Sequence, residues 1–344
     1  MRIGFKSLVV ATAAALMVAP LTTGSASADP TPVPQAQDIV GVGAQTTQAL
    51  LSQFSADYNA SLGSDTTSPR MYSWDATGPS PIQTKAGANA IYRPYGPSAG
   101  ITALVATGVT TTDFARSDRA SAATDPHGLD FVALAKDAVT WSSPANGNAP
   151  AQLTPGQLFG IYTCNITNWQ QISQSLRNAP IKPYLPRICS GTGTFFWNAI
   201  GHPALGGCVT IGPEENEGTD PALQDPNVVF PYSVGRYLGQ TAGGHSTTTD
   251  APGSLSLRNV VVGGPTLTPV TNNQIDINFA NSQFGHLVYN VFRDAEWSGT
   301  DAHAQALQNV FGPTGWICND TVAAVDLASY GFLSTPACGV ASLT

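Results

Sequence analysis

Hydrophobic residues follow two spacings along the chain, and the change from one to the other recurs three times. In "DIVGVGAQTTQALLSQFSADYN", from Asp38 to Asn59, a short β-type run and a Gly-containing turn precede Leu50, Phe54 and Tyr58 at helical spacing. The order returns in "AIYRPYGPSAGITALVATG" and in "PYLPRICSGTGTFFWNAIG". Strands that alternate with helices through short Gly/Ser turns predict an α/β fold with largely parallel sheets.

Further apolar runs extend this pattern. "FVALAKDAVTW", "VVF", "NVVVG" and "GHLVYNVF" are predicted strands, and the Gly/Ser/Thr-rich "QTAGGHSTTTDAPGSLS" is predicted to be an exposed loop. The chain has 344 residues, more than one hydrophobic core usually holds. We therefore expect two lobes.

The N-terminus has the features of an export signal. Arg2 and Lys6 precede an apolar run from Leu8 to Pro20 and then "SASADP", which predicts a signal peptide over residues 1–28. No cysteine lies at its end, so we expect no lipid anchor. Residues 29–37, "DPTPVPQAQ", are predicted to form a Pro-rich lead-in. The mature protein should be secreted and extracellular, without membrane insertion.

Composition narrows the classes of partner. Charged residues are 10% of the chain and apolar ones 42%, which is typical of a globular protein. The signal contains two of the 14 basic residues and none of the 22 acidic ones, so the mature chain has a net charge near −10. Such a chain is poorly suited to nucleic acid. Any bound anion must be held by short-range geometry.

The five cysteines lie in the exported part, where disulfides persist, and one must stay unpaired. Cys318 with Cys338 is the first predicted pair and Cys164 with Cys208 the second, which leaves Cys189 free; a pair of Cys189 with Cys208 stays open. No cysteine has zinc-ligand spacing, and we expect no metal or other cofactor.

The segment "GPSAG" has the G-x-S-x-G pattern of a hydrolase nucleophile, with Ser98 at its centre. Aspartates and then His286 or His303 follow in the order of a catalytic triad. However, Pro97 directly before the serine is awkward in so tight a turn, and no HGGG-like motif appears. These observations favour a protein that is not an enzyme.

The three small-residue turns suggest a different chemistry. Each precedes a predicted helix, whose first N–H groups have no partner within the helix and bind oxyanions well. Several such turns at the carboxyl edges of the sheets would form one cradle, where open α/β folds place their ligands.

The order of motifs resembles a known family. "DIVGVGAQTTQALLSQF", "GPSAG", "TTDFARSDRA", "LTPGQLFGIYTCNITNW", "RICSGTGTFF", "EENEG" and "PYSVGRYL" follow one another, and "ASYGFLSTP" closes the series. This order is similar to that of the phosphate-binding (PstS-like) proteins of phosphate ABC transporters and to secreted actinobacterial substrate-binding proteins. The resemblance covers residues 38 to 340.

The resemblance implies the two-lobed periplasmic-binding-protein fold of type II, with a mixed, mostly parallel sheet and flanking helices in each lobe. Lobe 1 would comprise residues 38–134 plus 280–344, and lobe 2 residues 135–279. The crossover strands would lie near "FVALAKDAVTW" and "GHLVYNVF". A ligand would be clamped between the lobes by domain closure.

By position, the resemblance also implies a ligand-binding set: Gln45, Thr46, Ser98, Asp118, Arg187, Ser190, Gly191 and Thr192. Asn216 and Gly218 would support the site without contacting the ligand. Asp118 is an acceptor, so it would favour an anion that still carries a proton, such as hydrogen phosphate, over sulfate. Alternatively, Asp118 caps the next segment or pairs with Arg116 or Arg119, and Arg187 forms a salt bridge.

Several positions depart from the family pattern. Gln45, Pro97 and Cys189 replace residues usual at these places, and Arg187 lies one position closer to Ser190. These changes would reshape the cradle, admit another oxyanion or abolish binding. We expect a monomeric solute-binding protein for phosphate or a related oxyanion, with an ABC permease as partner. The alternatives are a serine hydrolase using Ser98 and a ligand-free interaction module at the cell surface.

Overall fold

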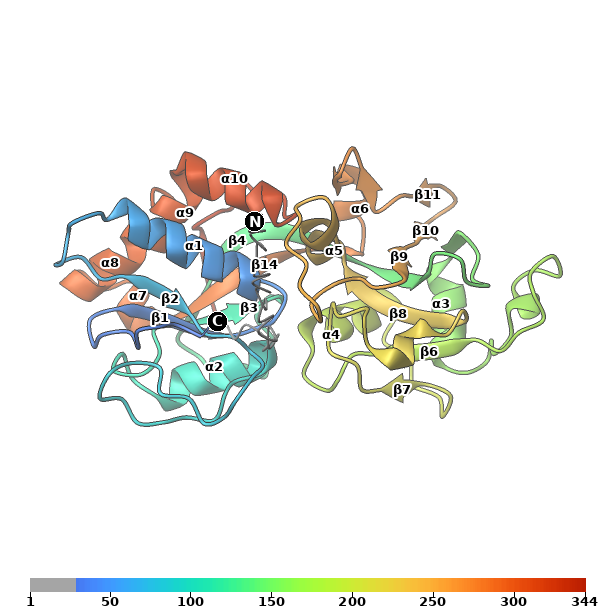
Figure 1. Cartoon of the computed structure of the whole chain (residues 1–344), viewed down its shortest axis with the longest axis horizontal. Helices are drawn as coiled ribbons and strands as arrows, with labels where there is room; N and C mark the ends of the chain where they lie inside the picture. Colours follow the sequence, from blue (N-terminus) through green and yellow to red (C-terminus); the bar gives the residue numbers. More distant parts are fainter. Residues whose placement is uncertain (1–28) are drawn as a thin grey trace, which may run out of the picture.

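The computed structural model of the chain describes residues 29–344, and Figure 1 shows two lobes side by side. The predicted signal, residues 1–28, lies outside the described residues. The lead-in lies against the first lobe, because Arg93 pairs with Asp29 at 2.6 Å and the N–H of Ala86 donates to the Pro34 carbonyl at 2.7 Å. Within residues 29–344 no helix is long and apolar enough to cross a membrane.

The first lobe is built on three parallel strands: β1 (Ile39–Gly43), β2 (Met71–Ser73) and β3 (Phe114–Ser117). All five residues of β1 are buried because helices cover both faces of the sheet. These helices are α1 (Gln48–Ser61), α2 (Gly96–Ala106), α7 (Asp294–Trp297), α8 (Ala302–Phe311), α9 (Trp316–Asn319) and α10 (Thr321–Ser329). In α1 the predicted residues Leu50, Phe54 and Tyr58 are buried, as their helical spacing requires.

The second lobe repeats this plan. Its parallel strands are β6 (Lys182–Leu185), β7 (Thr210–Ile211) and β8 (Val228–Ser233), and its larger helices are α3 (Pro155–Tyr162), α4 (Gly191–Ala199) and α5 (Val234–Thr241). Short elements complete it: β5 (Gln152–Leu153), η1 (Trp169–Gln171), η2 (Pro221–Gln224), β9 (Leu255–Leu257), β10 (Asn259–Val261), β11 (Thr266–Leu267), β12 (Val270–Thr271), β13 (Gln274–Ile275) and α6 (Ile277–Ala280).

Strand β4 (Leu129–Pro144) joins the two lobes. Its first part pairs with β14 (Gly285–Arg293) and β15 (Ala341–Leu343), and its end pairs with β8 and β9. One sheet therefore runs through both lobes in the order β2-β1-β3-β14-β4-β8-β6-β7. Ala135 and Val288 belong to the hydrophobic core of the first lobe, and Ala138 and Phe284 belong to that of the second.

Most predicted elements are present, including α4 and the strands β4, β8, β10 and β14. The predicted strand before Gly96 is not formed: Ile91 and Tyr95 make only isolated bridges, to Ile82 and Gly43. Pro94 interrupts this segment, and a proline has no N–H to donate to a strand ladder.

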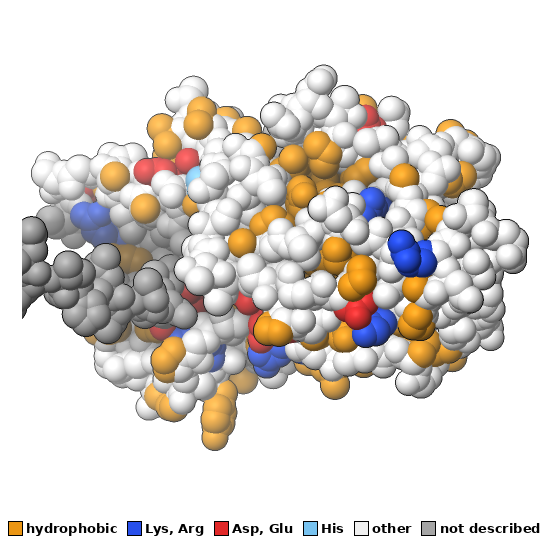
Figure 2. Space-filling view, turned by 45° about the vertical axis from the view of Figure 1, so that its right-hand side comes forward, with side chains coloured by type: hydrophobic (Ala, Val, Ile, Leu, Met, Phe, Trp, Pro, Cys, Tyr) orange, Lys and Arg blue, Asp and Glu red, His pale blue; other side chains and the backbone are white. Residues whose placement is uncertain are grey.

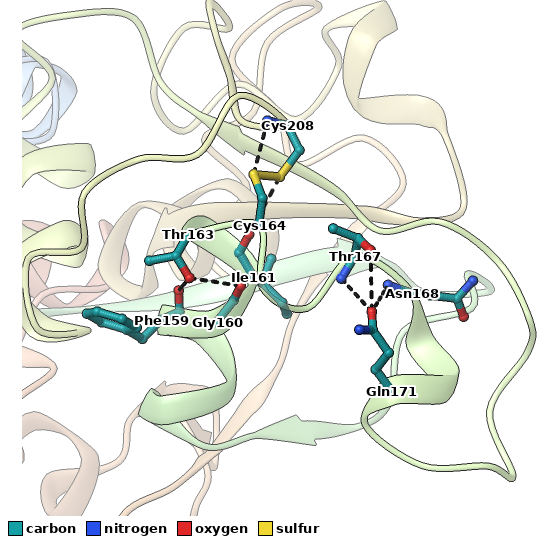
Figure 3. Close-up of a disulfide and its surroundings, with 9 residues drawn as sticks. All are labelled: Phe159, Gly160, Ile161, Thr163, Cys164, Thr167, Asn168, Gln171 and Cys208. Atoms are coloured by element: carbon teal, nitrogen blue, oxygen red, sulfur yellow. Dashed lines mark hydrogen bonds between the residues drawn. A yellow bond between two sulfur atoms is a disulfide. The ribbon is translucent and has the colours of Figure 1, made fainter.

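Two disulfides, Cys164–Cys208 and Cys318–Cys338, match the predicted pairs, and Cys189 is free and exposed. The alternative pair of Cys189 with Cys208 is therefore wrong. Figure 3 shows the first disulfide linking the chain just after α3 to the segment before β7. Gln171 orders the neighbouring turn by accepting from the N–H groups of Thr167 and Asn168 at 2.7 and 2.9 Å.

The face of the molecule in Figure 2 carries few charged side chains, in keeping with the composition. Its Lys and Arg side chains lie apart from one another, and hydrophobic side chains are scattered between them. Among the described residues visible on this face, the basic side chains form no continuous surface.

Candidate functional site

The first loop of the site connects β1 to α1 and presents Thr46. Gly43 has φ +117°, and a side chain there would meet the Arg116 carbonyl oxygen at 2.7 Å, so the loop needs glycine to lie this close to β3. The buried Arg116 side chain fixes the loop because its Nε donates to the Ala44 carbonyl at 2.9 Å. Thr46, only 1% exposed, then points its hydroxyl between the lobes, toward residues of the second.

The third loop connects β6 to α4 and brings Ser190, Gly191 and Thr192 to the same place. Ser190 is the N-cap of α4, and its hydroxyl accepts from the Gly193 N–H at 2.9 Å. A Cβ on Gly191 would lie 1.7 Å from Oδ1 of Asp118, so the first turn of α4 packs directly on this carboxyl of the other lobe. The hydroxyls of Thr46 and Thr192 are 3.2 Å apart.

The carboxyl group of Glu215 lies at the centre of these donors. The Ser190 hydroxyl donates to its Oε2, and the Thr192 N–H lies 3.3 Å from the same oxygen. The Thr46 hydroxyl lies 3.1 Å from Oε1 of Glu215 and 2.6 Å from Oδ2 of Asp118. We call Thr46, Asp118, Ser190 and Thr192 the cradle. A carboxyl of the chain itself thus occupies the cradle, and its contacts come from both lobes.

Two buried carboxyl groups share this small volume. Burial and the neighbouring Asp118 raise the pKa of Glu215 to about 8, and burial raises the pKa of Asp118. One hydroxyl proton of Thr46 cannot serve both acceptors, and Oδ1 of Asp118 has no hydrogen-bond partner among residues 29–344. We conclude that the pair retains a proton at neutral pH.

Asn216 and Gly218 hold the turn that carries Glu215. Asn216 adopts φ +59°, its Nδ2 donates to the Thr192 hydroxyl at 3.2 Å, and its Oδ1 accepts from the Ser233 N–H at 2.8 Å. A Cβ on Gly218 would lie 2.1 Å from the Pro252 carbonyl oxygen. These contacts are all with protein groups of the second lobe.

The structure places Ser98 apart from the cradle. Its side chain is exposed, and its hydroxyl accepts from Nη2 of Arg119 at 3.3 Å. Arg119 in turn pairs with Asp125 at 2.7 Å, so neither Arg119 nor Arg116 neutralises Asp118 by a direct ion pair. Within residues 29–344 no hydrogen bond joins Ser98 to a histidine, which disfavours the triad hypothesis.

Arg187 and Gln45 lie at the edge of the site. The Arg187 side chain is 45% exposed, pairs with Glu214 at 2.5 Å and lies 3.9 Å from the centre of the Tyr95 ring in the other lobe. Arg187 therefore forms a salt bridge, which is the alternative role considered for it from the sequence. Gln45 is buried, and its Nε2 lies 3.5 Å from Oε1 of Glu217.

A cavity of about 880 Å³ adjoins the cradle between the lobes. Gln45 and Ser52 line it from the first lobe, and Glu215, Glu217 and the ion pair of Arg236 with Asp250 line it from the second. Burial and the nearby Asp250 raise the pKa of Glu217 to about 7. The loop predicted to be exposed, around His245 to Asp250, forms part of this wall.

Sequence analysis missed Glu215. The segment "EENEG" places three carboxylates within four residues of a chain that is only 10% charged. This unusual density of acidic residues was the sequence feature that could have indicated a functional role. Which of the three points into the cradle depends on the left-handed turn at Asn216, which the sequence pattern does not reveal.

A model of the PBP superfamily domain matches residues 30–275, well over half of the chain. The chain belongs to the PBP superfamily. No curated protein sequence matches it. Among solved structures, this PBP superfamily member is similar in fold to an ABC-type phosphate transport receptor from Vibrio cholerae, with 16% identity, a TM-score of 0.58, and coverage of 87% of this chain and 100% of that one.

A second PBP fold of this kind comes from Clostridium perfringens, from a protein assigned as the substrate-binding protein of a phosphate ABC transporter and solved with bound phosphate. It shares 16% identity with a TM-score of 0.61, and the match covers 87% of this chain and 99% of that one. At this identity the likeness establishes the two-lobed fold, so the ligand must be argued from the residues of the cradle.

Proposed function

We propose that the chain is a solute-binding protein that captures hydrogen phosphate, or a closely related protonated oxyanion, between its lobes. The observation that carries this proposal is the convergence of Thr46, Ser190 and the Thr192 N–H on the oxygens of one carboxyl. The two oxygens of the Glu215 carboxyl lie where two oxygens of such an anion would receive the same donors, and this supports the proposal.

Asp118 would give the cradle its preference for a protonated anion. Its Oδ1 is buried without a donor, and an acceptor in that state is costly unless the ligand brings a proton. Hydrogen phosphate brings one, whereas sulfate would place a negative oxygen against the carboxylate, at a cost of several kcal/mol when both are desolvated.

The cradle would hold its ligand without a full positive charge. The hydroxyls of Thr46 and Ser190 and the N–H at the first turn of α4 are neutral donors, and Arg187 is engaged with Glu214 outside. Hydrogen bonds of neutral donors to a charged group each contribute about 1.5–3 kcal/mol to binding. The helix dipole of α4 adds to them.

The fold supports the same proposal, because the two similar structures named above are a phosphate transport receptor and a protein assigned to a phosphate ABC transporter. We further propose that the protein is exported and works as a monomer that delivers its ligand to an ABC permease. The two disulfides fit an oxidising compartment.

Calorimetric titration tests the proposal. The mature protein would be freed of bound ligand by unfolding with its disulfides intact, refolded, and titrated near pH 8 with phosphate and then with sulfate. We expect a phosphate signal and no sulfate signal. Silence to both anions would contradict the proposal and favour the ligand-free interaction module.

A further inference from the structure

The Glu215 carboxyl uses the donors that an oxyanion would need. Ser190 and the Thr192 N–H, from the second lobe, bind one of its oxygens, and Thr46, from the first lobe, lies within hydrogen-bond distance of the other. Asp118 of the first lobe stands against Gly191 of the second. The side chain of Glu215 therefore bridges the lobes in the manner of a bound ligand.

We propose that Glu215 is a built-in competing ligand: its carboxyl holds the two lobes together in the ligand-free protein, and an oxyanion binds by displacing it from the cradle. The second half of this statement rests on the proposed function. The first half, closure of the lobes by Glu215, does not.

A second buried carboxyl, that of Asp137, makes its hydrogen bonds within one lobe and serves as a comparison. Asp137 accepts from the Ser233 hydroxyl at 2.6 Å, the Gly235 N–H at 2.9 Å and the Ala138 N–H at 2.7 Å, all close to the start of α5 in the second lobe. Its donors all lie within one lobe. Glu215 differs, because its hydrogen-bonding neighbours belong to both lobes, Thr46 to the first and Ser190 and Thr192 to the second, and a change in the relative position of the lobes would separate them.

Two features would let Glu215 leave. It faces the Asp118 carboxyl, and two neighbouring carboxyls disfavour each other's charged form, so the contact is less favourable than one with donors alone. Glu215 also lines the interlobe cavity of about 880 Å³, which offers space for its side chain once an anion takes its place. A ligand can bind only to molecules in which Glu215 has left the cradle. Its apparent affinity is therefore the intrinsic affinity multiplied by the fraction of such molecules.

The first test measures the lobes without any phosphate. Spin labels on Val105→Cys in α2 and Ile211→Cys in β7, in a Cys189→Ser background, would report the interlobe distance by pulsed electron paramagnetic resonance; Val105 and Ile211 are both exposed, one in each lobe. In phosphate-free buffer we expect the parent protein to give one short distance and Glu215→Ala to give a longer or broader distribution.

Glu217→Gln is the matched control, because it changes an acidic side chain of the same turn that lines the same cavity outside the cradle, and it keeps the oxygen that accepts from Nε2 of Gln45 in the first lobe. It should keep the short distance of the parent. Glu215→Gln, which keeps the size of the side chain, guards against misfolding of the alanine variant and should open the lobes in part. Equal distances in the parent, Glu215→Ala and Glu215→Gln would overturn the proposal.

The second test is a phosphate titration by calorimetry. We expect Glu215→Ala to bind phosphate at least about tenfold more tightly than wild type, the factor for a competent state populated at one tenth or less. Glu217→Gln should stay within about twofold of wild type, since it keeps the contact with Gln45 and leaves that population unchanged. Glu215→Ala binding no more tightly than wild type would overturn the competition.

The two tests separate failure of this inference from failure of the proposed function. If none of the proteins binds phosphate, the proposed function fails, and the spin-label distances alone decide whether Glu215 closes the lobes. If wild type binds phosphate and Glu215→Ala changes neither distance nor affinity, the function stands and the inference fails.

Discussion

Helices α2 and α4 begin with similar small-residue turns, "GPSAG" and "SGTGT", yet only one of them delivers donors to the cradle. The two turns touch across the lobes, because a Cβ on Gly96 would lie 2.1 Å from the Cys189 carbonyl oxygen. A Cβ on Gly191 would lie 1.7 Å from Oδ1 of Asp118, which follows β3 in the first lobe. In both turns, glycine permits the lobes to approach.

The difference lies at the N-caps. The N-cap of α4 is Ser190, whose hydroxyl turns into the cradle, whereas the N-cap of α2 is Tyr95, which makes no side-chain capping bond. Pro97 removes an N–H from the first turn of α2, and Ser98 then points outward. A small-residue turn before a helix therefore does not by itself direct donors into the cradle, and the two turns differ in the residue at the N-cap.

The largest expected effect comes from Gly191→Ala. The added Cβ would meet the Asp118 carboxyl, which would keep the lobes from closing and lower phosphate affinity at least about 100-fold, or about 2.7 kcal/mol. Calorimetry measures this, with circular dichroism to check the fold. Gly156→Ala, at the start of α3, is the control, because its nearest neighbour would be Oγ1 of Thr154 at 3.9 Å. Binding within threefold of the parent would mean that the cradle is not the phosphate site.

Serine to alanine substitutions compare the two turns directly. Ser190→Ala should weaken phosphate binding by about 1–3 kcal/mol, because it deletes a hydrogen bond to a charged group. Ser98→Ala should change it by less than about 0.5 kcal/mol, as surface substitutions do. Both titrations should use Glu215→Ala as the parent, because Ser190 also donates to Glu215 and its loss would otherwise weaken the competitor too. Equal effects of the two substitutions would remove the distinction between the turns.

Asp118→Asn sharpens the comparison within the cradle. The amide can donate to an unprotonated anion, so the ratio of phosphate to sulfate affinity should fall about tenfold, or about 1.4 kcal/mol. Phosphate affinity itself should change less than that ratio. Competition titrations with both anions give the ratio, and an unchanged ratio would remove Asp118 from ligand recognition.

The smallest expected effect concerns pH and stability. The pKa of Glu215 rises from an ordinary 4.5 to about 8 on folding, so the folded protein holds a proton that the unfolded chain releases above pH 4.5. Stability should therefore decrease as pH rises toward 8. Between pH 6 and pH 8.5 we expect Glu215→Gln to lose at least about 1 kcal/mol less than wild type, since each unit of pKa shift corresponds to about 1.4 kcal/mol.

Chemical unfolding at several pH values measures this difference. The pKa of Glu217 is raised to about 7, so its titration also lowers the free energy of unfolding as pH rises. This contribution is the same in both proteins and cancels when their stability curves are compared. Parallel stability curves for wild type and Glu215→Gln would show that Glu215 does not hold a proton in the folded state.

The elements of the cradle were predictable, because they depend on local patterns. The strand, turn and helix from Ile39 to Ser61 follow from hydrophobic spacing, and Ser190 is a favourable N-cap ahead of α4. The strand predicted before Gly96 is not formed because Pro94 interrupts it. Disulfide pairing of Cys318 with Cys338 also followed from short separation along the chain.

The occupant of the cradle was not predictable, because it depends on contacts between distant segments. Glu215 meets Thr46 across 169 positions of sequence, and nothing in either segment alone shows that they touch. Likewise, Ser98 and Ser190 lie in similar turns, but only the packing of the lobes leaves one exposed and the other buried.

The sequence by itself determined the elements, the two lobes' α/β character and the donors at the start of α4, since hydrophobic periodicity and capping act over a few residues. The tertiary structure alone decided which carboxyl fills the cradle and which serine faces it. Those outcomes depend on how two separately packed cores lie against each other along β4 and β14. Their packing buries Glu215 and brings Asp118 close to it, and both effects raise its pKa.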